Sequence, residues 1–294
     1  MSDTIPHPDQ LPTTRSSLSV WECHPVAIRV PRCPSHNLTM RFHLRPRESR
    51  DTRPRLPPVD VAWIEKNRRP FDAHEVGSLV PVAFSRYARL FHPAWAASDR
   101  RDTPVRWDAV AAWSGRTMHE LAQWETLSTP ATDVDRPPPF IAPPDADGLP
   151  QASLPALLEV LFAYTSTPDD CFIGVWEGYG WPVEAWAGPE VLELENRTYL
   201  VRRGPLSLVR EIGWKPAGDR LHVEPPNVLW PADRAWFVAS DTDLDSTYLG
   251  GSVALVDAVL EHAGLEVWPI AAADLITVDP RPDHGLLTST RLPN

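Results

Sequence analysis

Hydrophobic residues recur at helical spacing in the segment that follows Ser153. Five of them fall on one face of a helix with 3.6 residues per turn. They are Leu154, Leu157, Leu158, Leu161 and Phe162. Serine is a common N-cap residue, and Pro155 is tolerated in a first turn because its missing N–H would have no partner there. The pattern predicts a helix over residues 153–163. A similar pattern predicts a second helix over 252–263, ended by Gly264.

Helical spacing also occurs before residue 128, which predicts a mostly helical N-terminal half. Gly115 is placed to end one of these helices with a left-handed C-cap. Thr117 and Glu120 have the spacing of a capping box, in which each side chain bonds the backbone N–H of the other. Three helices are expected in this half, at residues 84–91, 107–114 and 117–127.

After residue 170 the period of the apolar positions shifts towards two, which is the period of a β-strand. Strands are predicted at residues 171–176, 191–195, 198–203, 235–241 and 265–270. Short connections between them favour an antiparallel arrangement. The expected fold class is therefore α+β: a helical N-terminal part packed with a mainly antiparallel sheet that carries at least two helices.

The composition is that of a globular chain, with 43% hydrophobic and 23% charged residues among 294. The 34 prolines indicate much turn or extended structure, whereas the 13 tryptophans supply a large apolar area for a core. The net charge of −11 argues against a general nucleic-acid binder, whose affinity would come from basic residues on phosphates. We therefore expect no nucleic-acid partner.

The sequence also favours a cytoplasmic protein. Three cysteines are too few and too scattered for a disulfide framework, and the N-terminus does not resemble a signal peptide. No apolar run reaches the roughly 18–20 residues that a transmembrane helix needs. We expect no membrane association and no cofactor, and the sequence leaves the oligomeric state open.

Composition changes sharply along the chain. Residues 1–58 are rich in proline and carry nine arginines against five acidic residues, so we expect a disordered arm. Met40 is an alternative start, which would remove most of this arm. Residues 59–279 are expected to form a globular α+β domain, with a possible division at the proline- and aspartate-rich segment 128–152. Residues 280–294 are expected to form a flexible tail.

Four segments resemble an uncharacterised family of tryptophan-rich proteins from high-GC bacteria. They are residues 76–95, 105–115, 171–181 (CFIGVWEGYGW) and 230–252, which contain the string SDTDLDSTYLGGS. The likeness covers about residues 60–275 and implies a bacterial cytoplasmic protein, but no site residue, because no activity is established for that family. A local likeness at residues 79–90 is to the SMI1/KNR4-type immunity fold, where a proline-led amphipathic helix precedes a sheet.

Three carboxylates lie at and after the end of the strand predicted at 235–241. If the strand persists, alternation places Asp241, Asp243 and Asp245 on one side, where they repel unless a cation, an arginine or water separates them. Asp243 and Asp245 also resemble the first motif of haloacid-dehalogenase-type phosphatases, although that family has this strand at the start of its domain and a lysine further on. The alternatives are a metal or phosphate site and a solvated strand end.

Four aromatic residues form the second candidate site. Trp176, Tyr179, Trp181 and Trp186 alternate with glycines, which let the backbone turn sharply and leave rings partly exposed for a ligand or peptide. The alternative is packing in the core of the sheet. From these features we expect a non-catalytic binding or interaction protein, of the immunity or regulatory kind, with a protein partner. The alternative function is a metal-dependent hydrolase or phosphatase that uses the three aspartates.

Overall fold

The computed structural model describes residues 54–96, 103–146, 148–179, 190–195, 197–214, 222–223 and 226–277. Most of the predicted arm, the whole predicted tail, and Trp181 and Trp186 lie outside these residues. The boundaries expected for the globular domain and for its division at 128–152 stay predictions.

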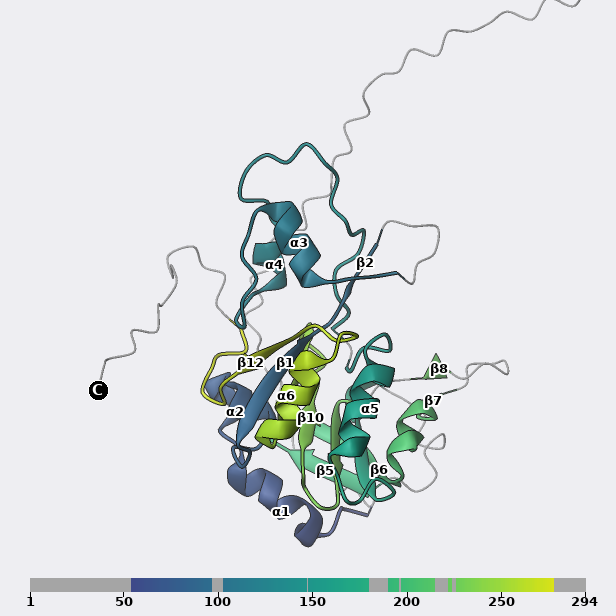
Figure 1. Cartoon of the computed structure of the whole chain (residues 1–294). Helices are drawn as coiled ribbons and strands as arrows, with labels where there is room; N and C mark the ends of the chain where they lie inside the picture. The colour runs from purple at the N-terminus through teal and green to yellow at the C-terminus, as the bar shows by residue number, and fades with distance from the viewer. Residues whose placement is uncertain are drawn as a thin grey trace, which may run out of the picture. The chain divides into compact units, whose positions relative to one another are not determined.

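An antiparallel sheet of eight strands organises the described chain (Figure 1). Its strands are β1 (Arg86–Phe91), β4 (Cys171–Trp176), β5 (Glu190–Leu194), β6 (Arg197–Gly204), β9 (Val228–Pro231), β10 (Phe237–Ala239), β11 (Ser246–Gly251) and β12 (Val267–Ile270). Their order is β12-β1-β11-β10-β9-β4-β6-β5, and each neighbouring pair is antiparallel. The expected α+β class is confirmed.

Helices cover both faces of this sheet. Helices α5 (Leu154–Ala163) and α6 (Val253–Glu261) share one core with Ile173 and Leu229, and α1 (Pro58–Asn67) and α2 (Val76–Leu79) share another with Phe172. Because successive side chains on a strand point to opposite faces, Phe172 and Ile173 serve different cores. The sheet is therefore buried on both sides.

A small helical segment is inserted between β1 and α5. We call residues 103–146 the insert; it contains α3 (Trp107–Ser114) and α4 (Trp124–Leu127), and its β3 (Pro104–Val105) pairs with β2 (Ala94–Trp95). Its core is aromatic, with Trp107 5.4 Å from Trp124 between ring centroids. The carboxylate of Glu266, just before β12, accepts the backbone N–H of Trp107 at 2.7 Å and of Asp108 at 2.8 Å. The start of α3 is thus fixed by the sheet.

The helices and strands that depend on local signals agree with the sequence predictions. Helix α5 follows Ser153, and Gly115 ends α3 with φ 70°. Ser252 caps α6 by accepting the N–H of Leu255 through its hydroxyl at 3.2 Å. The strands predicted around β4, β5, β6, β10 and β12 are also present, with ends that differ by a few residues.

The helix predicted over 84–91 was wrong, because residues 86–91 form β1 and the two residues before it form a bend. Strand β1 lies inside the sheet and buries side chains on both faces, including Tyr87, Ala88 and Leu90. A strand buried on both faces lacks the alternation of polar and apolar residues, and its apolar positions imitate helical spacing.

The helix predicted over 117–127 was wrong for most of its length. Residues 117–123 form turns and loop, and only the four residues of α4 are helical. The backbone carbonyls of Glu120 and Ala122 accept hydrogen bonds from Arg89. Tertiary contacts therefore bind the carbonyls of this stretch, and no capping hydrogen bond forms at Thr117 among the described residues.

The last residues assigned to the disordered arm are packed on the sheet. Val191 of β5 donates to the carbonyl of Pro54 at 2.8 Å and accepts from the N–H of Leu56 at 3.1 Å. Leu56 is buried in the core, and Arg55 forms an ion pair with Glu193 at 2.7 Å. Residues 54–56, which composition assigned to the arm, are therefore packed on the sheet, because the average composition of the arm conceals this buried leucine.

Strand β11 was not anticipated in the sequence. Its residues Gly250 and Gly251 reduce strand propensity. A Cβ on Gly250 would lie 2.5 Å from the ring of Phe84 and 2.8 Å from Val80, so glycine is required where this strand passes beneath them.

Within the described residues, no helix has the length and apolar character needed to cross a membrane.

Candidate functional site

One arginine joins the two groups of residues that the sequence singled out. Arg197, the first residue of β6, places Nη2 2.9 Å from Oδ1 of Asp241 and 2.9 Å from Oδ2 of Asp243. Its guanidinium also lies 5.3 Å from the ring centroid of Trp176 and 5.8 Å from that of Phe71. We call these five residues the Arg197 cluster.

One side of the cluster is buried and the other side is exposed to solvent. The Asp241 side chain is 5% exposed, Arg197 is 18% exposed and Asp243 is 72% exposed. Burial disfavours the charge on Arg197, but the hydrogen bond and the charge of Asp241 outweigh burial and raise the pKa of the guanidinium. The arginine is therefore a fixed cation at the surface, and Asp243 presents a carboxylate to solvent.

The aromatic part of the cluster is held by Asn227. The Trp176 backbone N–H donates to Oδ1 of Asn227 at 2.8 Å, and Nδ2 of Asn227 donates to the Tyr179 hydroxyl at 3.2 Å. The rings of Trp176 and Tyr179 meet edge to face at 5.3 Å. Gly178 packs on the indole so closely that a Cβ there would lie 2.1 Å from it. Both rings are half-buried, and of the four predicted aromatic residues these two are described.

The structure does not gather the three aspartates into one group. Strand β10 ends at Ala239, so the alternation assumed for Asp241, Asp243 and Asp245 does not apply to the turn they occupy. Oδ1 of Asp245 lies 3.6 Å from Nη2 of Arg89 instead. Among the described residues, no three His, Cys, Asp or Glu side chains are placed to hold a metal ion. Arginines relieve the repulsion, and this arrangement does not favour the hydrolase alternative.

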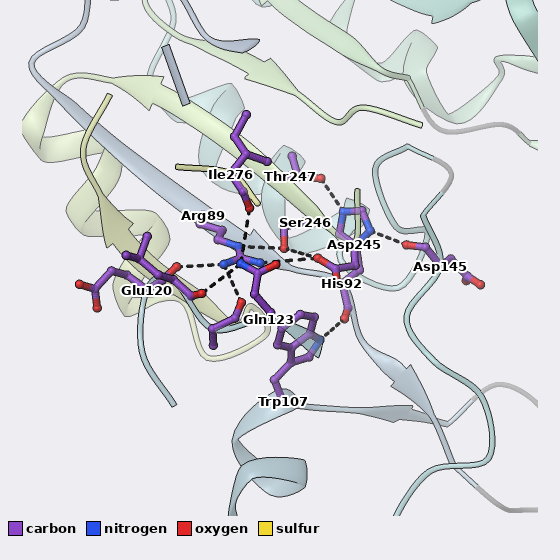
Figure 2. Close-up of polar contacts among 12 residues, drawn as sticks. Arg89, His92, Trp107, Glu120, Gln123, Asp145, Asp245, Ser246, Thr247 and Ile276 are labelled. Atoms are coloured by element: carbon purple, nitrogen blue, oxygen red, sulfur yellow. Dashed lines mark hydrogen bonds and ion pairs between the residues drawn. The ribbon is translucent and has the colours of Figure 1, made fainter. Parts of the chain in front are cut away.

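Arg89 is the centre of a buried polar network (Figure 2). It is 1% exposed, and its Nε donates to the Ser246 hydroxyl at 2.9 Å. Its Nη1 donates to the carbonyls of Glu120 at 3.0 Å and Ala122 at 2.8 Å, and the guanidinium lies 4.3 Å from the Phe91 ring centroid. One buried cation therefore connects β1, β11 and the insert.

His92 forms a second connection between the sheet and the insert, as Figure 2 shows. Its Nδ1 lies 2.7 Å from the carbonyl of Asp145, and its Nε2 lies 2.8 Å from the Thr247 hydroxyl. A carbonyl can only accept, so Nδ1 carries the proton and Nε2 accepts from Thr247. Burial lowers the pKa of His92 to about 4, and the imidazole is neutral at pH 7.

This histidine does not form an accessible catalytic pair. The Thr247 and Ser240 hydroxyls are hydrogen-bonded at 3.0 Å, and a hydroxyl beside an unprotonated imidazole nitrogen is the geometry of an activated nucleophile. Both residues, however, are 1% exposed, and His92 is fully buried. A substrate atom cannot reach them in this conformation, so the network serves to hold the insert against the sheet.

A groove adjoins the Arg197 cluster. It has a volume of about 380 Å³ and is lined by Glu65, Arg68, Arg69, Pro70, Leu194 and Glu195. The contact between groove and cluster is Phe71, whose backbone N–H donates to Oε2 of Glu195 at 2.9 Å. The end of α1, the following turn and the end of β5 therefore form one surface with the cluster.

Comparisons with models of protein families, with curated proteins and with solved structures gave no match for this chain. The resemblances to the tryptophan-rich family and to the SMI1/KNR4-type fold stay predictions.

The sequence analysis missed the three residues on which these arrangements depend. Arg89 carried a usable signal, since it is the one charged residue within the stretch from Tyr87 to Phe91. A charge in a buried stretch needs a partner. Arg197 and His92 carried no comparable local signal, because their partners lie in distant parts of the chain.

Proposed function

We propose that this chain is a cytoplasmic, non-catalytic binding protein of the immunity or regulatory kind, and that a protein partner docks on the Arg197 cluster. The observation that supports this is the arginine itself, which lies near two half-buried aromatic rings and beside an exposed carboxylate. Aromatic and arginine side chains are enriched in protein interfaces and account for most of their binding energy.

The cluster is already ordered without a partner, which favours affinity. Asp241 fixes the Arg197 side chain, and the Trp176 ring packs against Tyr179 and Gly178, so little side-chain entropy remains to be lost on docking. The ion pair of Asp243 with Arg197 is largely solvated on the Asp243 side and is therefore weak. A charged group of a partner protein can therefore pair with Arg197 or with Asp243 at a small cost in free energy.

Affinity capture with the full chain, in an extract of the organism that encodes it, tests this proposal. The captured protein is then purified and its affinity measured for the wild type and for Trp176→Ala. We expect at least a tenfold loss, as for a central aromatic residue of an interface. Trp113→Ala is the matched control, since Trp113 is half-buried in the insert and binds the carbonyl of Arg136 at 3.0 Å. Equal affinity of wild type and Trp176→Ala would contradict the proposal.

A further inference from the structure

The two arginines that line the groove are already bound. Arg68 donates to the carbonyl of Ser78 through Nε at 2.9 Å and also through Nη2. Arg69 forms an ion pair with Glu75. Burial, the largest influence on Arg68, lowers the pKa of its guanidinium. Both cations therefore hold the groove wall to the α2 segment instead of offering free donors to a ligand.

The two carboxylates of the groove, in contrast to the arginines, are open to solvent. Glu65 and Glu195 are exposed, and neither has an ion-pair partner within the part of the chain that the structure describes. One oxygen of Glu195 accepts the Phe71 N–H. Glu65 lies in the last turn of α1, a helix of ten residues whose C-terminal end carries the negative pole of the helix dipole. Lys66 shares this last turn, and Arg68 and Arg69 are partly buried, so the exposed charged groups of the groove lining are the two carboxylates. A cationic head can approach them from solvent.

The apolar part of the lining suits a long side chain. Pro70, which is exposed, and the small exposed part of Leu194 provide hydrocarbon surface beside the two carboxylates. Lysine and arginine pack their aliphatic stems on such surface while the charged head stays near oxygen acceptors. The groove volume of about 380 Å³ lies within the range for ligand pockets and has room for a long side chain.

Building on the proposed function, we infer that this groove receives an arginine or lysine side chain of the partner protein, with its head between Glu65 and Glu195. The contact makes the partner's docking surface basic. The excess of acidic over basic residues in the chain, 39 against 28, is complementary to such a surface.

Titration with short peptides tests the groove without the partner. The probes are acetyl-Gly-Arg-Gly-amide and acetyl-Gly-Glu-Gly-amide, added to the full chain at 150 mM salt, and the readout is the Phe71 backbone amide by ¹⁵N NMR. We expect the arginine peptide to shift this amide saturably, and Glu65→Gln to weaken binding at least fivefold. Glu193→Gln is the matched control, because Glu193 is on β5 and paired with Arg55. It should leave the affinity unchanged.

Several outcomes would overturn the inference. These are no saturable shift with the arginine peptide, an equal loss of affinity in Glu65→Gln and Glu193→Gln, and a shift with the glutamate peptide instead. A captured partner that needs Trp176 but is indifferent to Glu65→Gln would also overturn it while leaving the proposed function intact. Peptide binding together with a partner indifferent to Trp176→Ala would support a groove that binds cationic side chains and contradict docking on the Arg197 cluster.

Discussion

His92 accepts a hydrogen bond from Thr247 at 2.8 Å, and this contact joins the end of β1 to β11 inside the protein. The other nitrogen of the same ring donates to the Asp145 carbonyl of the insert. The neutral imidazole therefore satisfies one acceptor and one donor at once. A protonated ring has two N–H donors. The Thr247 hydroxyl could then no longer donate to Nε2 and would have to turn its own proton away from the ring.

The stability of the protein is expected to fall in acid because of His92. The unfolded histidine takes up a proton near its ordinary pKa of 6.5, whereas the folded one does so at about 4. Between these values the unfolded state binds more protons, so stability falls as the pH drops from 6.5 to 4, by about 3 kcal/mol.

Urea unfolding at several pH values measures this effect. His92→Gln should flatten the dependence between pH 6.5 and 4, because glutamine has no proton to bind. The carboxyls of Asp245 and Glu266 have pKa values raised by burial, so they contribute stability of the opposite sign in acid. They are present in both proteins, so the difference between wild type and variant reports His92. Parallel curves would contradict the assignment.

Arg89→Met is expected to be strongly destabilising. It leaves the carbonyls of Glu120 and Ala122 without their buried donor, and each unsatisfied buried acceptor costs about 1–3 kcal/mol. Arg86→Met is the matched control on the same strand, because Arg86 is partly exposed and pairs with Asp257 at the surface. It should cost at most about 1 kcal/mol. Similar free energies of unfolding for the two variants would show that Arg89 is not the connection described.

The caps of the helices provide a third prediction. Ser252→Ala should cost about 0.5–2 kcal/mol, because it removes the acceptor of the Leu255 N–H at the start of α6. Thr117→Ala should change the free energy of unfolding very little, since Thr117 is exposed and lies outside any helix. Thermal or urea unfolding of both variants is sufficient. A larger loss at Thr117 than at Ser252 would be incompatible with the structure.

Divalent cations are expected to leave the melting temperature unchanged. Asp241 and Asp243 both pair with Arg197, and Asp245 lies near Arg89, so a cation would have to compete with an arginine to bind. The measurement is thermal unfolding with and without millimolar Mg²⁺, Mn²⁺ or Ca²⁺. A rise that disappears in a double variant with Asp243→Asn and Asp245→Asn would restore the metal-dependent hydrolase as a candidate.

Sequence patterns could predict the elements that depend on local signals. Helices α5 and α6 each follow a serine and have one apolar face, and β4 is a short apolar run between turns. The Ser252 side chain caps α6, whereas the Ser153 side chain makes no capping hydrogen bond to α5. Strands β1 and β11 could not be recognised, because burial on both faces removes alternation from β1 and glycines lower the strand propensity of β11. The helix expected at Thr117 failed because Arg89 binds the carbonyls of that stretch.

Part of the candidate site could be predicted from the sequence, for a similar reason. Trp176 and Asp243 could be singled out by their types and neighbours. Their connection through Arg197 could not, because the residues come from strands and turns more than twenty positions apart. The sequence allowed an arginine as one means of separating the aspartates but contained no sign of which one.

Affinity of the captured partner for three forms of the full chain tests the central claim most directly. The forms are the wild type, Asp243→Arg and Asp257→Arg, which carry the same change of charge at two exposed aspartates, one in the Arg197 cluster and one on α6. If the partner docks on the cluster, Asp243→Arg should weaken binding at least tenfold and Asp257→Arg less than twofold. Equal effects of the two substitutions, or none from Asp243→Arg, would contradict the account.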